Sequence, residues 1–374
     1  MSGIEETMKK LLSFRSVLIF GGAGFVGSNW ACHLLKTTDA RVHIFDNLSR
    51  PGVHRNLEWL QKEWKDSERL KITIGDIRDG ALVERAVQNA GEIYHFAAQV
   101  AVTCSVRDPR EDFEINALGT LNILEAARKS GRRPFVLYTS TNKVYGNLRS
   151  KPLILSGKRY SALEESGVNE SQPLDLYSPY GCSKGTADQY VHDYGRMFHL
   201  PTVVFRMSCI AGPQQFGNED QGWVAHFLYS ALEAKPLTIY GDGRQVRDVL
   251  SVKDLLLAFE KVRAQTEKTG GEIYNIGGGI RNSVSLLEVI EMIEEITGRR
   301  LCYSLEKPRP GDQLFYVTDF AKLTDHTGWK PRISVRQNIQ MIWNWWRDER
   351  ARSVVTPISA AAPQPLAQVP EAAS

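Results

Sequence analysis

The stretch that most constrains the fold is an apolar run followed by three glycines and a segment with helical periodicity. Residues 16–20 form the apolar run, which is typical of a strand buried on both faces of a parallel sheet. Gly21, Gly24 and Gly27 follow at once, and residues 28–35 have the periodicity of a helix. In this order, glycines allow a tight turn and let a pyrophosphate approach the backbone at the helix N-terminus. The stretch therefore predicts a dinucleotide-binding unit.

An acidic residue ends the next strand-like segment. Residues 42–45 run into Asp46, which stands about 20 residues beyond the glycines, where a carboxylate bonds the adenosine ribose hydroxyls. The same carboxylate would repel a 2′-phosphate, so NAD is favoured over NADP, although the nearby Arg50 reduces that preference. A simple turn role for Asp46 is the weaker alternative.

Further segments alternate between strand and helix patterns. Strands are expected at residues 70–74, 92–96, 134–138 and 201–205, and helices at 112–130 and 180–197. This alternation predicts an α/β fold with a Rossmann-type doubly wound parallel sheet and a smaller C-terminal α/β lobe. The predicted parts are an N-terminal extension (1–14), a mainly dinucleotide-binding domain (15–200), a mainly substrate-binding lobe interwoven with it (201–350) and a disordered tail (351–374). The polar interval 147–176 is predicted to be a loop.

The segment Ser178–Lys184 carries the candidate chemistry. If a helix begins near Tyr180, then Tyr180 and Lys184 lie one turn apart on the same face. An ammonium beside the phenol would lower its pKa from about 10 toward the working pH, so that the phenolate could take a proton from a sugar hydroxyl. Residues 139–146 end the fifth predicted strand, and a hydroxyl there would lie across the cofactor from Tyr180. The alternative is an ordinary tyrosine and lysine at a common spacing.

Charge and cysteine usage narrow the possible partners. A net charge of +3 over 374 residues is too small to indicate a nucleic-acid or membrane partner. The five cysteines are scattered, without the spacing of metal ligands, and are predicted to be reduced thiols in a cytoplasmic protein. No apolar run reaches the length of a membrane span, and no signal-peptide pattern precedes the first strand.

Together these motifs resemble the extended short-chain dehydrogenase/reductase family, specifically its nucleotide-sugar epimerases and dehydratases, over about residues 15–347. The resemblance implies that Tyr180 is the catalytic base, that Lys184 assists it and reaches the nicotinamide ribose, and that Thr141 is the catalytic hydroxyl residue. It further implies that NAD is lined by Gly21, Gly24, Phe25, Val26, Gly27, Asp46, Asn47, Asp76, Ile77, Ala97, Ala98, Gln99, Asn116, Thr139, Tyr180 and Lys184.

The residues after Thr141 separate the branches of this family. Its 4,6-dehydratases and decarboxylases place an acid where this chain has Asn142-Lys143, which argues against elimination or decarboxylation here. Residues 140–146, 178–185, 220–224 and 243–249 are similar to the branch that inverts C2 of CDP-paratose and CDP-tyvelose, although Met207 stands where histidine is expected. The resemblance implies that the substrate is contacted by Thr141, Asn142, Lys143, Ser208, Gln221, Arg247 and Arg309. Of these, Arg247 and Arg309 are expected to bind the diphosphate.

Two other functions remain open from the sequence. A UDP-sugar 4-epimerase would use the same machinery, because oxidation and reduction at C4 need the same base and hydroxyl. A non-catalytic nucleotide-sugar-binding protein would have no use for Tyr180, Lys184 and Thr141 together. The resemblance also implies a homodimer or homotetramer.

Overall fold

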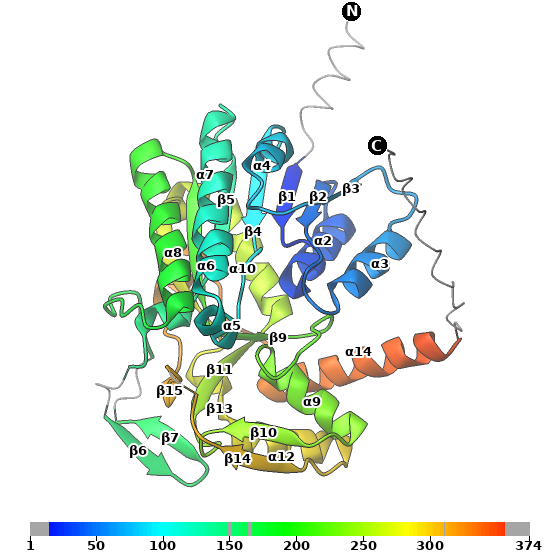
Figure 1. Ribbon diagram of the computed structural model, residues 1–374, viewed down its shortest axis with the longest axis vertical. Helices are drawn as coiled ribbons and strands as arrows, with labels where there is room; N and C mark the ends of the chain where they lie inside the picture. The colour runs from blue at the N-terminus through cyan, green and yellow to red at the C-terminus, as the bar shows by residue number, and fades with distance from the viewer. Residues whose placement is uncertain (1–14, 149–151, 164–166, 310, 356–374) are drawn as a thin grey trace, which may run out of the picture.

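The computed structural model describes residues 15–148, 152–163, 167–309 and 311–355, and the extension predicted at 1–14 lies outside them. A seven-stranded parallel sheet forms the centre of the molecule, in the order β12-β8-β5-β4-β1-β2-β3 (Figure 1). Its strands are β1 (Ser16–Phe20), β2 (Arg41–Asp46), β3 (Leu70–Ile74), β4 (Glu92–His95), β5 (Phe135–Thr141), β8 (Thr202–Met207) and β12 (Glu272–Ile276). The strand order reverses between β1 and β4, which is where such sheets bind a dinucleotide beyond their carboxyl ends. The predicted doubly wound fold is confirmed.

Helices cover both faces of this sheet. On one face lie α2 (Phe25–Thr37), α3 (Val53–Glu63) and α10 (Val252–Ala264), and on the other lie α4 (Gly80–Val87), α7 (Gly119–Lys129) and α8 (Pro179–Phe198). The shorter segments are α5 (Val102–Arg107), α6 (Pro109–Phe113), the π-helical turn η1 (Glu114–Leu118), the 3₁₀ turns η2 (Asn142–Tyr145) and η3 (Ile280–Asn282), α11 (Thr266–Thr269) and α13 (Ala321–Thr327).

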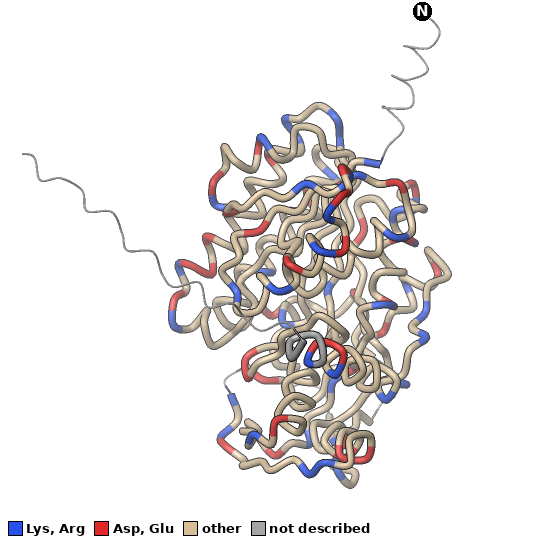
Figure 2. The backbone as a smooth tube through the Cα atoms, turned by 90° about the vertical axis from the view of Figure 1, so that its right-hand side faces the viewer, with Lys and Arg blue, Asp and Glu red and all other residues tan. Residues whose placement is uncertain are grey.

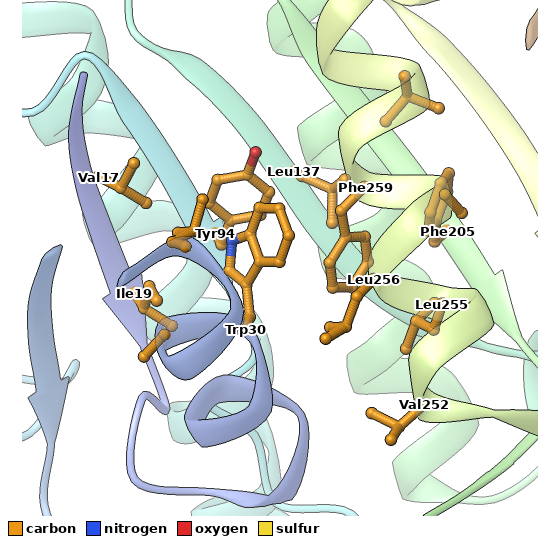
Figure 3. Close-up of a cluster of buried hydrophobic side chains, with 14 of the residues drawn as sticks. Val17, Ile19, Trp30, Tyr94, Leu137, Phe205, Val252, Leu255, Leu256 and Phe259 are labelled. Atoms are coloured by element: carbon orange, nitrogen blue, oxygen red, sulfur yellow. The ribbon is translucent and has the colours of Figure 1, made fainter. Parts of the chain in front are cut away.

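Aromatic side chains fill the layer between the sheet and the helices α2 and α10. The Trp30 ring lies 5.0 Å from Tyr94 and stands edge-on to Phe259 at 5.4 Å, and all three side chains are fully buried (Figure 3). Rings paired in this way contribute about 0.5–1.5 kcal/mol beyond the burial of their surface. This packing joins α2, β4 and α10 beside the glycine turn.

A smaller lobe follows β8. Its sheets join β9 (Cys209–Ala211), β11 (Val246–Ser251), β13 (Ser283–Ser285) and β15 (Phe315–Tyr316), and separately β10 (Leu237–Tyr240) and β14 (Tyr303–Glu306). Helices α9 (Trp223–Glu233), α12 (Leu286–Thr297) and α14 (Val335–Val355) pack on them around a separate apolar core. The two parts are interleaved, because β12 and α10 come from the later part of the chain but belong to the large sheet and its covering layer.

Two segments differ from the sequence-based predictions. The interval 147–176, predicted to be a loop, contains an antiparallel hairpin of β6 (Leu153–Ser156) and β7 (Arg159–Ala162). Helix α14 continues to Val355, five residues into the predicted tail, and residues 356–374 lie outside the described part of the chain.

Charged residues of both signs are interspersed along the side of the molecule shown in Figure 2. Among the described residues, no helix combines the length and the apolar character that crossing a bilayer requires.

Candidate active site

The glycine turn between β1 and α2 has the geometry that its sequence predicts. Gly21 has φ +75°, and a Cβ there would lie 2.6 Å from the backbone nitrogen of Ala97. A Cβ on Gly27 would lie 2.2 Å from the carbonyl oxygen of Gly21, so only glycine lets α2 pack this closely on the turn. Within the described chain, no side chain caps the N-terminus of α2 at Gly24, and its first turn carries no acid. The N–H groups of that turn can therefore bind an anion.

Two carboxylates lie beside this turn. Asp46 ends β2 and accepts hydrogen bonds from the backbone nitrogens of Ala23 (3.0 Å) and Leu48 (2.9 Å), while burial raises its pKa. Asp76 pairs with Arg78 at 2.8 Å and accepts from Asn47 at 3.0 Å, and the Arg78 bond is the main cause that lowers its pKa to about 2. The structure thus brings the predicted Asp46, Asn47 and Asp76 together on the cofactor side.

A buried polar network supports the predicted residues at the end of β4. The side-chain amide of Asn116 accepts from the Gln99 backbone nitrogen and donates to the Gln99 carbonyl, both at 3.0 Å, and the Gln99 side chain donates to Asp112 at 2.7 Å. Asp112 also accepts from Ser183 on α8. Sequence reasoning missed Asp112, although its position four residues before Asn116 places both on one helical face.

The remaining predicted cofactor residues lie at or near the carboxyl ends of the same sheet. Phe25 and Val26 open α2, Ile77 is buried under Gly119, Ala97 donates its N–H to the Phe20 carbonyl, Ala98 follows it, and Thr139 donates to the His95 carbonyl at 3.2 Å. These positions follow β1, β3 and β4 or lie near the end of β5, and the parallel sheet brings these four strand ends to one edge.

The side chains of Tyr180 and Thr141 lie close enough for the Thr141 hydroxyl to act on the Tyr180 phenol. Tyr180 is the second residue of α8, a helix whose N-terminus is capped by the Ser178 side chain, and Thr141 is the last residue of β5. Burial raises the pKa of Tyr180 to about 12, and a hydrogen bond from the Thr141 hydroxyl and the Arg50 guanidinium act in the opposite direction. Thr141 also accepts the backbone N–H of Lys143 at 3.2 Å. The predicted meeting of phenol and hydroxyl is present in the structure.

Lys184 lies one turn after Tyr180 on α8, as its spacing predicts. Its ammonium nitrogen donates to the Thr139 carbonyl at 2.7 Å and lies 4.3 Å from the centre of the Tyr138 ring. Burial lowers the pKa of Lys184 to about 7, against the opposing carboxylates of Asp188 and Asp112. The expectation that this ammonium lowers the pKa of Tyr180 stays a prediction, and in the structure the Thr141 hydroxyl and the Arg50 guanidinium act in that direction.

The two residues after Thr141, which begin the η2 turn, contact residues 311–313 far along the chain. Lys143 is half-buried and pairs with Asp312 at 3.3 Å, and it also reaches the Gly311 carbonyl at 3.4 Å. Asn142 donates its side-chain amide to Gln313 at 3.2 Å. Gln313 was not found from the sequence, whose only signal for it is its position four residues after Arg309.

The two predicted diphosphate arginines are both paired with carboxylates. Arg247 on β11 bonds Asp312 at 2.7 Å. Arg309 stacks on the Tyr240 ring at 4.0 Å and pairs with Glu219 (3.4 Å) and Asp220 (3.3 Å). A diphosphate that binds both guanidinium groups would take the place of these carboxylates as their partner.

Two further predicted substrate residues make contacts of different kinds. Gln221 bonds Arg50 and so links the lobe to the loop after β2, close to the cofactor side. Ser208 bonds Asp248, a fully buried carboxylate whose pKa burial raises. Ser208 is therefore held by an internal partner.

Comparison with known proteins identifies the family. The model of the family described as GDP-mannose 4,6 dehydratase matches residues 18–342. The chain is 41% identical over 337 residues to CDP-paratose 2-epimerase of Salmonella typhi, which covers 88% of this chain and 98% of that protein. The chain belongs to the GDP-mannose 4,6 dehydratase family within the extended short-chain dehydrogenase/reductases. The family predicted from the motifs is confirmed.

Other members of this extended short-chain dehydrogenase/reductase branch differ in their reaction. The chain is 32% identical over 345 residues to dTDP-glucose 4,6-dehydratase of Streptomyces antibioticus, covering 90% of this chain and 93% of that protein. A crystal structure of UDP-glucuronic acid 4-epimerase from Bacillus cereus, solved with UDP-glucuronic acid and NAD, has a TM-score of 0.76 at 26% identity and covers 89% of this chain and 99% of that one. The family relationship thus establishes a nucleotide-sugar enzyme and leaves its reaction type to the residues of the site.

Proposed function

We propose that this protein is an NAD-dependent epimerase that inverts C2 of a CDP-linked sugar. The observation that carries the proposal is that the Thr141 hydroxyl acts on the Tyr180 phenol and lowers its pKa, with Asn142 as the next residue. The family resemblance implies that the dehydratases carry an acid at this position. This arrangement supplies a base and a hydroxyl for oxidation at one carbon and omits the acid that elimination requires. The similarity to CDP-paratose 2-epimerase supports C2 and the CDP group.

The residues around the glycine turn fit NAD. The uncapped N-terminus of α2 offers N–H groups to a pyrophosphate, and glycine at 24 leaves the approach open. Asp46 keeps lone pairs for ribose hydroxyls beyond its two backbone bonds. When bound, NAD would supply a reversible acceptor for the hydride that leaves the sugar carbon.

The chain's own residues control the proton and the sugar oxygen. Tyr180 takes the hydroxyl proton as the carbon is oxidised and returns it after inversion, which is the role of a general base and acid. Thr141 donates a hydrogen bond to the same oxygen and steadies the charge that develops there. Lys184, held by the Thr139 carbonyl, provides a donor on the cofactor side of Tyr180.

A second candidate is 4-epimerisation of a UDP-sugar. It is favoured by the structural similarity to UDP-glucuronic acid 4-epimerase. The two candidates share every step except which sugar carbon faces Tyr180, so product analysis separates them.

The decisive experiment incubates the purified protein with CDP-, UDP- and GDP-sugars and identifies the products by NMR. The proposal expects a C2 epimer from a CDP-hexose or CDP-dideoxyhexose, and no turnover by the Tyr180→Phe protein. A C4 epimer of a UDP-sugar would establish the second candidate, and a dehydrated keto sugar would refute both.

A further inference from the structure

Gln313 lies two residues before β15 and is fully buried. Its side chain connects this part of the chain to the η2 turn. Its side-chain nitrogen donates to the Gly146 carbonyl at 2.6 Å, and its side-chain oxygen accepts from the Asn142 amide nitrogen at 3.2 Å. These two bonds span the η2 turn, since Gly146 follows its end and Asn142 begins it. One amide thus fixes both ends of the turn that follows Thr141.

The chemistry of the partners determines which way both amides face. A backbone carbonyl can only accept, so the Gln313 nitrogen must face Gly146 and its oxygen must face Asn142. Asn142 must then present its amide nitrogen to Gln313, and its own carbonyl oxygen turns toward Thr141, 3.4 Å from the hydroxyl. The orientation of Asn142 is therefore set by Gln313.

This orientation decides where the Thr141 proton goes. One lone pair of the Thr141 hydroxyl is already occupied by the Lys143 N–H at 3.2 Å. The bond that its single proton makes to the Asn142 carbonyl oxygen measures 3.4 Å, which is long for a hydroxyl bond, and the same hydroxyl acts on the Tyr180 phenol to lower its pKa. A neutral amide at this distance is a weak competitor, so the proton remains available to Tyr180 and to the sugar oxygen.

We propose that Gln313 is a positioning residue that keeps a neutral, correctly turned amide at position 142 and thereby reserves the Thr141 hydroxyl for the reacting oxygen. The proposal rests on the function proposed above and adds a reason for its reaction type. A carboxylate at 142 would place two acceptors face to face with the buried Gln313 oxygen, and it would also draw the Thr141 proton away from Tyr180. Gln313 thus favours an amide over a carboxylate at position 142, where the dehydratases of the family carry an acid.

The test replaces Gln313 by methionine, which has a similar size but makes neither bond. The matched control is Gln265→Met, because Gln265 also donates to a backbone carbonyl, that of Thr327 at 3.3 Å, and lies at the end of α10. With whichever nucleotide sugar the wild type epimerises, Gln313→Met should lower kcat roughly 10- to 100-fold with little change in KM, since misplacing a catalytic group by about 1 Å costs up to that much. Gln265→Met should behave like the wild type.

Epistasis separates positioning from general destabilisation. In a Thr141→Val background the hydroxyl is gone, so adding Gln313→Met should have no further effect on kcat. An equal further loss of kcat in that background would overturn the proposal. If Gln313→Met does not fold, Asn142→Ala, which removes the other amide of the pair, replaces it in the same cycle.

A spectroscopic measurement decides the question without turnover. Protein carrying ¹³Cζ-tyrosine gives one NMR resonance that is missing from Tyr180→Phe, and its chemical shift reports hydrogen bonding of the phenol. Gln313→Met should move this resonance, and Gln265→Met should not; the other groups that act on the phenol, Asp112 and Arg50, are unchanged in both. An unmoved resonance refutes the role of Gln313 even if no sugar is turned over, whereas absence of turnover alone refutes only the proposed function.

Discussion

A buried tyrosine makes a poor base until something stabilises its anion. Burial raises the pKa of Tyr180 to about 12, and the Thr141 hydroxyl and Arg50 offset that only in part. The bound cofactor and substrate must therefore contribute to its ionisation, and Tyr180 is expected to act as a base only in the assembled complex.

Replacing Tyr180 by phenylalanine removes only the phenolic oxygen. Loss of a general base typically costs about 10²–10⁴-fold, so turnover should fall at least that far, while NAD content and the melting temperature stay near those of the wild type. The control is Tyr190→Phe on the same helix, whose side chain is exposed. Near-normal turnover of the Tyr180→Phe protein would contradict the mechanism.

Lys184 should give the fold a recognisable pH dependence. Burial lowers its pKa in the folded state to about 7, below the ordinary value of 10.5 that it has in the unfolded chain. Between these values the unfolded chain binds a proton that the folded protein does not, so the free energy of unfolding rises with pH across this window. Lys184→Met lacks this contribution, and the difference in melting temperature, wild type minus variant, should increase from pH 7 to pH 10. A constant difference would mean that Lys184 keeps its ordinary pKa.

At this scale the sequence predicted residues whose spacing lies on a single element or at a strand end. Tyr180 and Lys184 were found because four residues make one helical turn, and Asp46 because it ends a strand behind a glycine turn. Gln313 and Asp112 were not found, because their roles arise from contacts with residues far away in the chain. No local pattern marks a side chain whose partner is 171 residues away.

Among the elements, the β1–turn–α2 unit is the most exacting. A Cβ on Gly27 would lie 2.2 Å from the backbone oxygen of Gly21, and backbone atoms of a turn cannot move aside as a flexible side chain can. Gly27→Ala should therefore lower the melting temperature and release NAD, measured in the supernatant after denaturation. Gly80→Ala is the matched control, because a Cβ there meets nothing closer than 3.7 Å. Full NAD retention by Gly27→Ala would contradict the reading of this turn as the pyrophosphate site.

The elements that the sequence did not reveal have physical reasons for being missed. β11 carries Arg247 and Asp248 in a strand that is buried throughout, and these charges are tolerated only because Asp312 and Ser208 bond them. The β6–β7 hairpin lacks a clear alternation and is held by tertiary bonds instead, such as that from the Tyr160 hydroxyl to Asp242 at 2.8 Å. The strands of the large sheet were predicted from their apolar runs, although β4 and β8 also bury Glu92 and Arg206 against ion partners.

On the scale of the whole molecule, the lobe and the large sheet meet around the reaction site. Gln221 contacts Arg50, and Asp220 accepts from Thr103 at 2.9 Å, so one loop of the lobe touches the loop after β2 and the helix α5. In the proposed function the lobe holds the nucleotide sugar, whereas Tyr180 belongs to the other part. The carbon that faces Tyr180 would then depend on both parts together.

The isotope label at C2 tests this arrangement directly. If the hydrogen leaves C2 as hydride and returns to the other face of the same carbon, then a CDP-sugar deuterated at C2 should give a C2 epimer that keeps its deuterium in ordinary water. The unlabelled sugar should gain none in deuterium oxide, because Tyr180 exchanges the hydroxyl proton and not the carbon-bound hydrogen. Removal of the C2 proton by enolisation would exchange this position with solvent in both experiments. Washout of the label in the first, or its incorporation in the second, would exclude the hydride route. Inversion at C4 with the C4 hydrogen retained would keep the chemistry of Tyr180 and Thr141 and show instead that the lobe presents a different carbon to them.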